Sequence, residues 1–243
     1  DERSDPLGVV AVHNWVRTQT VTVTARRKNG EVNYKKAVEE PTEQNRWAIQ
    51  ARKTDELAQG TGVSFIHLMD TEADDYKLLY DLQDTRYVVR LCYDRLLDKS
   101  MGCKPKEKLR DFLSRQPLIC ERIVHLSPRD QKSASNSSKR TKQRGARTAK
   151  LEIRASAVTV NRPRYLGNPY PRTLTFNVVY VQETDCPIGT EPVEWILATS
   201  DPVETREQIV KVVDWYRKRW IIEEYFKAIK TGCSFESRQL ESL

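Results

Sequence analysis

One stretch near the C-terminus, residues 214–230, carries acidic, basic and aromatic side chains at helical spacing. At about 100° per residue, five of them project from one sector of about 80° on a helix. These five are Tyr216, Arg219, Glu223, Lys227 and Lys230. A carboxylate ringed by basic side chains is the arrangement expected where a metal ion and a phosphate backbone meet an acid. The stretch therefore indicates a helix that handles phosphate.

A simpler explanation of the same spacing is a solvated ladder of ion pairs. Arg219 and Glu223 lie four residues apart, as do Glu223 and Lys227, and each such pair stabilises an exposed helix by about 0.3 kcal/mol. The aromatic residues Tyr216 and Trp220 argue against a face that is merely solvated, since large rings favour burial. Both explanations stay open on spacing alone.

An apolar stripe runs beside the polar one. Ile222, Phe226 and Ile229, spaced four and three apart, predict a face that docks the helix on a core. Upstream, residues 201–204 (Asp-Pro-Val-Glu) supply an N-cap, a proline at the first helical position and a Glu at the third, so we expect the helix to begin there. Gly232 is a natural end.

A second acid follows an apolar run. Residues 63–69 predict a short strand that ends at Asp70, and residues 71–83 predict a helix. Asp at this place suits an N-cap, because its carboxylate accepts hydrogen bonds from the first amides of a helix. It equally suits a site residue, because ligands of α/β sheets bind beyond the carboxyl ends of strands.

The remaining elements predict an α/β protein with a β-rich middle. A helix is expected over 42–58, and strands are expected over 7–16, 20–24, 86–91, 119–126, 151–160, 172–182 and 193–199. Between them, residues 131–150 are rich in Ser, Lys and Arg and predict a mobile basic loop. We therefore divide the chain into residues 1–92 and 191–243, two parts of one core, and residues 93–190, a β-rich insertion.

The composition is that of a charged, basic protein. Of 243 residues, 31% are charged and 38% hydrophobic, and the net charge is +7 with a pI near 9.1. This balance favours a polyanionic partner, nucleic acid first. No apolar run approaches the roughly 18 residues of a membrane span, and the first residues are no signal peptide. Five cysteines without a C-x-x-C pair favour a reducing cytoplasm over a disulfide framework or a zinc knuckle.

The order of the C-terminal residues also resembles a known signature. Tyr216, two residues, Arg219, three residues, Glu223, six residues and Lys230 resemble the Y-R-E-K signature of bacterial insertion-sequence transposases of the DDE type. Residues 70–74, Asp-Thr-Glu-Ala-Asp, resemble the segment of that family that carries its second acid. The resemblance implies that these proteins' Asp-Asp-Glu triad has two members here.

For the site, the resemblance implies that Asp70 and Glu223 are catalytic acids that bind metal. Two Mg²⁺ or Mn²⁺ ions about 4 Å apart would activate the attacking oxygen and neutralise the phosphate, and hard carboxylate oxygens suit both ions. It further implies a set of DNA contacts, with the second lysine the weaker candidate: Tyr216, Arg219, Lys230, Lys227, Arg90 and Trp195. Trp195 would stack on a flipped base, or, alternatively, pack within the sheet.

For the fold, the resemblance implies an RNase H-like mixed sheet flanked by helices and interrupted by the β-rich insertion. The first triad Asp stands on the first strand of that fold, and neither Asp1 nor Asp5 lies in such a context. We therefore expect a fragment that lacks the first acid, the N-terminal strands and the regions for homodimer formation in a synaptic complex. Weak or no catalysis by this chain alone is expected.

The function implied is that of a DNA transposase, which cleaves double-stranded DNA at transposon ends and joins it to target DNA in the bacterial cytoplasm, at the nucleoid. Two alternatives stay open. One is an RNase H-fold nuclease without strand transfer, which would need no end-specific contacts. The other is a catalytically inactive DNA-binding or regulatory fragment, which the missing first acid favours.

Overall fold

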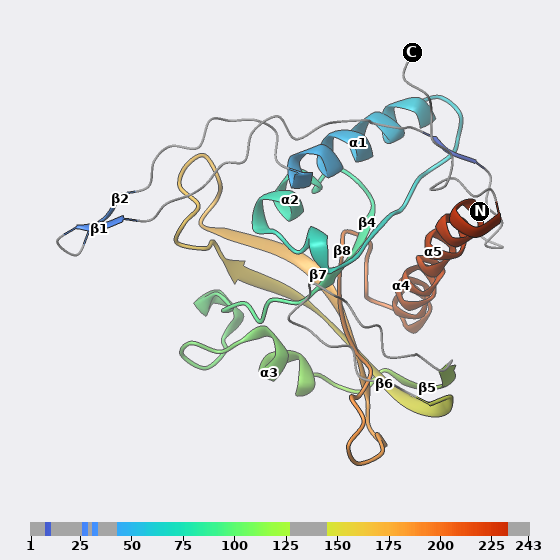
Figure 1. Cartoon of the computed structure of the whole chain (residues 1–243). Coiled ribbons are helices and arrows are strands. Elements are labelled where there is room, and N and C mark those ends of the chain that lie inside the picture. The colour runs from blue at the N-terminus through green and yellow to red at the C-terminus, as the bar shows by residue number, and fades with distance from the viewer. Residues whose placement is uncertain (1–7, 11–25, 29–30, 34–42, 127–144, 233–243) are drawn as a thin grey trace.

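One curled sheet of six strands forms the centre of the protein. The computed structural model describes residues 8–10, 26–28, 31–33, 43–126 and 145–232 (Figure 1). The six strands are β3 (His67–Met69), β4 (Tyr87–Leu91), β5 (Cys120–Leu126), β6 (Arg147–Asn161), β7 (Thr173–Glu183) and β8 (Glu194–Thr199). Their order is β3-β4-β8-β7-β6-β5. The β3–β4 pair is parallel and the other four are antiparallel.

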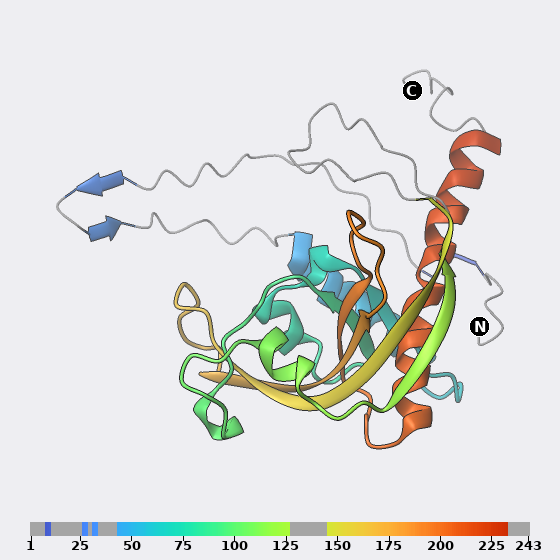
Figure 2. The ribbon, with the colours of Figure 1, turned by 90° about the horizontal axis from the view of Figure 1, so that it is seen from below.

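The sheet curls because its two longest strands, β6 and β7, bend as they cross the molecule (Figure 2). The right-handed twist of each strand accumulates over such lengths. β5, β6 and β7 come from the predicted β-rich insertion, yet they continue the same sheet as β3, β4 and β8. A separate pair, β1 (Arg26–Lys28) and β2 (Glu31–Asn33), is antiparallel.

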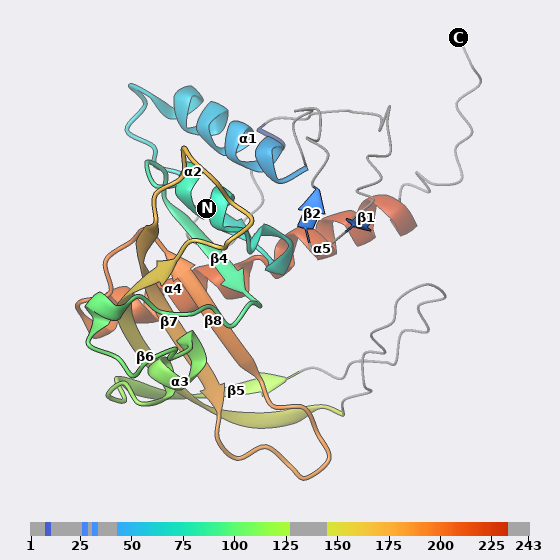
Figure 3. The same cartoon turned by 90° about the vertical axis from the view of Figure 1, so that its left-hand side faces the viewer.

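Helices cover both faces of the sheet (Figures 1 and 3). On one side lie α1 (Glu43–Ala58), the 3₁₀ turn η1 (Thr71–Ala73) and α2 (Tyr76–Asp81). On the other lies α4 (Arg206–Lys218), followed by α5 (Trp220–Lys227) and the π-helical turn η3 (Ala228–Gly232). The smaller elements η2 (Lys99–Met101) and α3 (Leu109–Ser114) precede β5. No helix in the described part of the chain combines the length and apolar character that a membrane span requires.

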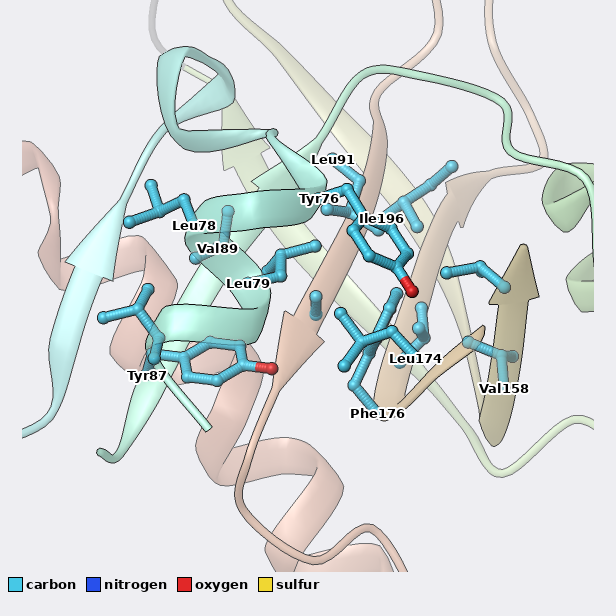
Figure 4. Packing of buried hydrophobic residues seen from close by; sticks show 14 of the residues in the cluster. Tyr76, Leu78, Leu79, Tyr87, Val89, Leu91, Val158, Leu174, Phe176 and Ile196 are labelled. Carbon is cyan, nitrogen blue, oxygen red and sulfur yellow. The ribbon is translucent and has the colours of Figure 1, made fainter. Parts of the chain in front are cut away.

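Alternation along the central strands divides the core in two. Val88 and Val89 of β4 are both fully buried, but they belong to different clusters because neighbouring side chains of a strand point to opposite faces. Val89 shares its cluster with Leu78 and Leu79 of α2 (Figure 4). Val88 shares the other cluster with Val212 and its neighbours in α4. This double cover explains why the middle of β4 and the middle of β8 are apolar on both faces rather than alternating.

Most predicted elements are confirmed with shifted ends. The helix over 42–58 and the strands over 86–91, 119–126, 172–182 and 193–199 are present. The strand predicted over 63–69 is shorter, since only His67–Met69 pairs. The predicted helix over 71–83 divides into η1 and α2.

Three predicted elements fall wholly or partly outside the described residues. Of the strands predicted over 7–16 and 20–24, only residues 8–10 are described, and they form no strand. Of the basic loop predicted over 131–150, residues 147–150 are instead the start of β6, where they pair with β5. That part of the prediction was wrong, because the pairing with β5 extends the strand beyond Leu151 toward the N-terminus.

The start predicted for the last long helix was also wrong. Thr205 caps α4, since its hydroxyl accepts from the Gln208 amide at 3.3 Å and the Gln208 side chain accepts from the Thr205 amide at 2.9 Å. Asp201 instead accepts from the Arg86 guanidinium at 3.0 and 2.5 Å. The capping box at Thr205 therefore starts the helix, while Asp201 ties the preceding loop to the sheet.

The double core gives a test of the fold. Leu79→Ala removes a fully buried side chain of α2, so we expect the free energy of unfolding to fall by about 2–5 kcal/mol in urea titrations followed by circular dichroism. Leu57→Ala, on α1 and 63% exposed, is the matched control and should change it by less than about 0.5 kcal/mol. Equal effects of the two substitutions would contradict the assigned packing.

Candidate active site

Asp70 lies where β3 ends, on extended backbone with φ −92° and ψ −172°. Its Oδ1 accepts from the Thr71 amide at 2.8 Å, so the N-cap role considered for it is present. The same oxygen accepts from the Tyr216 hydroxyl at 3.2 Å, and Oδ2 lies 3.1 Å from Nη2 of Arg219. Capping one turn thus leaves the carboxylate able to contact side chains from a distant helix.

The side chains that reach Asp70 come from the end of α4, and an apolar face of α4 packs this helix on the sheet. Ile209, Val212, Val213 and Tyr216 are buried against the sheet. The Tyr216 ring is 5% exposed, and its hydroxyl reaches the end of β3. The packing of α4 therefore fixes how close the residues that follow it come to the first acid.

The helix breaks at Arg219, where α4 ends and α5 begins. The Arg219 amide donates to the Tyr216 carbonyl at 3.1 Å, three residues back rather than four, which tightens the turn. Figure 2 shows that the two helices still form one rod. The single uninterrupted helix that we predicted over 214–230 is thus divided, and Lys230 falls in the π-helical turn η3, where the α-helical angle does not apply.

Arg219 joins the two acids. Its Nη2 lies 2.7 Å from Glu223 Oε1 and 3.1 Å from Asp70 Oδ2. Burial alone would lower the pKa of Arg219, but hydrogen bonding to Glu223 and attraction by Asp70 outweigh it and raise the pKa. The guanidinium therefore stays charged between two carboxylates. The Arg219–Glu223 pair of the predicted ladder exists, but it extends to Asp70 on another element.

Aromatic and basic side chains from the sheet complete the cluster. Trp195 of β8 packs edge-to-face on Tyr216, with ring centroids 5.5 Å apart at 64°. Arg90 of β4 places Nη1 3.9 Å from Asp70 Oδ1 and donates from Nη2 to the Glu194 carbonyl at 3.4 Å. Burial raises the pKa of the Tyr216 phenol. The positive charge of Arg90 opposes this shift, and the negative charge of Asp70 adds to it. Tyr216 therefore keeps its proton and donates it in the hydrogen bond to Asp70.

Not every candidate residue joins this cluster. The structure brings together Asp70, Arg90, Trp195, Tyr216, Arg219 and Glu223. Lys227 and Lys230 are exposed further along the rod, beyond Glu223. Trp195 is half-buried against the core beneath α4, so its sheet-packing role is present alongside any contact made by its exposed part.

The apolar stripe of α5 does not dock on a core, contrary to our prediction. Ile222 and Phe226 are 45% and 52% exposed, and no residue of α5 is buried. Both line a hollow of about 650 Å³ that opens between α5, β3 and α1, with Asp70 and Arg219 also in its wall. The opposite wall includes Trp47 of α1. No pattern in the sequence indicated that α1 would border this hollow, because its residues resemble those of any amphipathic surface helix.

Two other aspartates near Asp70 have structural roles. Asp74 is buried, accepts from the Cys92 and Tyr93 amides at 2.6 and 2.7 Å, and forms an ion pair with Arg95. Asp75 caps α2 by accepting from the Leu78 amide at 3.1 Å. Of these three aspartates, Asp70 is therefore the one whose carboxylate pairs with Arg219.

The donors fit a divalent cation in part. Mg²⁺ is commonly bound by one or two carboxylates together with waters and phosphate oxygens, and Asp70 and Glu223 supply two half-exposed carboxylates. Within residues 43–126 and 145–232, no group of three or more His, Cys, Asp or Glu side chains could hold a metal ion. The described residues thus offer two neighbouring carboxylates of the kind that a hard cation prefers.

A comparison with protein families shows which domain the chain contains. The family model described as "Transposase DDE domain" matches residues 11–243. The match includes both acids and every other residue of the cluster. Members of such a family act on DNA and use divalent metal ions, and their domain implies an RNase H-like fold.

The two aspartates make a sharp contrast. Asp74→Asn leaves Arg95 buried beside a neutral side chain, so we expect the free energy of unfolding to fall by about 3–5 kcal/mol. Asp70→Asn should change it by less than about 1 kcal/mol, because Asn also caps well and the site is half-exposed. Urea titrations of both variants measure this, and a large loss with Asp70→Asn would assign Asp70 to the fold.

Proposed function

Since the chain belongs to the DDE transposase family, we propose that Asp70 and Glu223 are two of its catalytic, metal-binding acids. The observation that carries the proposal is the meeting of the two carboxylates at one guanidinium, although they come from β3 and α5. A chance surface ladder on α5 would not include an acid from a strand end. DNA transposition is the activity that the family implies.

The chemistry proposed is metal-dependent cleavage of DNA at a transposon end and transfer of the free 3′ strand to target DNA. Mg²⁺ or Mn²⁺, when bound, would supply activation of the attacking oxygen and neutralisation of the phosphate. Asp70 and Glu223 would hold the ions, and Tyr216 orients Asp70 by donating to its Oδ1. The third acid of the triad comes from outside residues 43–126 and 145–232.

We place DNA on the side of the cluster where its basic residues are exposed. Arg219 and Arg90 lie beside the acids, so they are suited to phosphates next to the cleaved bond. Lys230 and, more weakly, Lys227 are suited to phosphates further along the rod. Trp195, held on edge by Tyr216, offers a ring on which a displaced base can stack.

The fold proposed around this site is RNase H-like. β3, β4 and β8 with α1, α2 and α4 make the core, and residues 93–190 are an insertion that extends the core sheet through β5, β6 and β7. Among the described strands β3 lies at the edge of the sheet, next to Asp70, and a further strand of that fold would pair there. We therefore propose that the core consists of residues 1–92 and 191–243, with the insertion between them.

Metal binding tests the site directly. In calorimetric titrations with Mn²⁺, Asp70→Asn and Glu223→Gln should each weaken binding by at least about tenfold, because each removes a ligand. Glu224→Gln is the control, since Glu224 is the next residue on the same helix and accepts from Trp220 Nε1 at 3.1 Å. The site assignment fails if Glu224→Gln weakens binding as much as Glu223→Gln, or if neither ligand substitution has an effect.

DNA binding tests the outer contacts. Lys230→Gln should weaken binding to any duplex by a similar factor and lower the slope of log K against log salt by about 1, because one phosphate contact is lost. Fluorescence anisotropy with two duplexes of unrelated sequence measures both quantities. Lys211→Gln, an exposed lysine of α4, should leave the slope unchanged, and an unchanged slope for Lys230→Gln would remove it from the DNA path.

A further inference from the structure

The nitrogen that joins the two acids stands where a metal ion would compete for them. Nη2 of Arg219 is within hydrogen-bond distance of both Glu223 Oε1 and Asp70 Oδ2. The two oxygens therefore lie no farther apart than those two bonds placed end to end, and an ion bound to both would draw the two carboxylates toward the place of that nitrogen. The Arg219 side chain is 21% exposed, and the two carboxylates are 33% and 41% exposed.

We propose that Arg219 is a placeholder cation, which neutralises the acid pair in the metal-free protein and must leave it when metal binds. The proposal rests on Asp70 and Glu223 being the metal site. It assigns Arg219 a second role besides phosphate contact, namely control of metal loading. Arg219 is a positioning residue in this role, because it acts through the two acids.

Size excludes simultaneous occupancy. Mg²⁺ and its oxygen ligands lie about 2.0–2.1 Å apart, so an ion bound to both carboxylates would occupy the space that Nη2 fills. Arg219 can leave without unfolding the helix, because its backbone is fixed at the α4–α5 junction while its side chain is long and reaches solvent. Arg90 lies 3.9 Å from Asp70, but among the described residues it forms no ion pair with Glu223, so it does not bridge the two acids as Arg219 does.

Exchange of the Arg219 guanidinium for a metal ion would couple metal binding to DNA binding. A phosphate that takes up the Arg219 guanidinium frees both carboxylates, and a metal that takes the carboxylates frees Arg219 for phosphate. Each ligand therefore raises the affinity for the other, and linkage requires the two factors to be equal. The protein would hold metal weakly until DNA occupies the site.

The experiment is Mn²⁺ binding by the chain without DNA. Arg219→Gln removes the competing charge, so we expect Mn²⁺ to bind about five- to tenfold more tightly than in the unsubstituted chain. Arg217→Gln is the matched control, because it removes the same charge two residues away, where Arg217 lies 3.7 Å from Asp214, and should change the affinity by less than about twofold. Equal or weaker binding by Arg219→Gln overturns the proposal.

Thermal melts give a second readout that does not depend on titration. In EDTA, Arg219→Gln leaves the two carboxylates to repel each other and should melt below the unsubstituted chain, whereas saturating Mn²⁺ should remove the difference. Arg219→Lys, which retains the charge on a group without a planar fork, should bind Mn²⁺ with intermediate affinity. This variant keeps the proposal testable if the Gln variant does not fold, and Mn²⁺ affinity unchanged in Arg219→Lys would then overturn it.

The same titrations separate the two proposals. If Asp70→Asn and Glu223→Gln abolish Mn²⁺ binding while Arg219→Gln does not strengthen it, the metal site stands and the placeholder role is wrong. If neither acid substitution affects Mn²⁺ binding, the metal site itself is wrong, and the placeholder role falls with it.

Discussion

The candidate site depends on the burial of one face of α4 against the sheet. Ile209, Val212 and Val213 are almost fully buried there, beneath the strands that carry Val88 and Leu197. Burying three such side chains contributes several kcal/mol, roughly 1.5–3 each, whereas the polar contacts of the half-exposed site contribute far less. The apolar contacts therefore set the distance between β3 and α5, and the carboxylates meet because the core requires it.

Local patterns predicted what is determined locally. The apolar runs of β4, β7 and β8 predict strands correctly, because each of these strands buries side chains on at least one face of the sheet. The spacing of Tyr216, Arg219 and Glu223 placed these residues on one side of a helix, and the structure brings Arg219 to both acids. Their common function is proposed from that geometry and from the family, since spacing alone fits a solvated ladder equally well.

Tertiary contacts decided what the sequence could not predict. Asp201 looks like a helix cap, but its pairing with Arg86, far away in the chain, moves the helix start to Thr205. The apolar stripe of Ile222 and Phe226 predicted docking, yet α5 extends past the sheet and leaves both half-exposed beside a hollow. The periodicity of a helix predicts which of its faces is apolar, but it does not predict which element, if any, covers that face.

Two aspartates of one short segment, each paired with an arginine, show how burial separates a structural role from a proposed chemical one. Asp74 is fully buried, pairs with Arg95 and accepts from two backbone amides, so a change in its charge would cost folding energy. Asp70 pairs with Arg219 but remains one-third exposed, and its partner is shared with a second acid. The exchange that we propose requires a shared, partly exposed cation of this kind, and the enclosed Arg95 does not meet that requirement. The sequence Asp-Thr-Glu-Ala-Asp presents both aspartates alike, and only their surroundings leave Asp70 open to the metal chemistry that we propose for it.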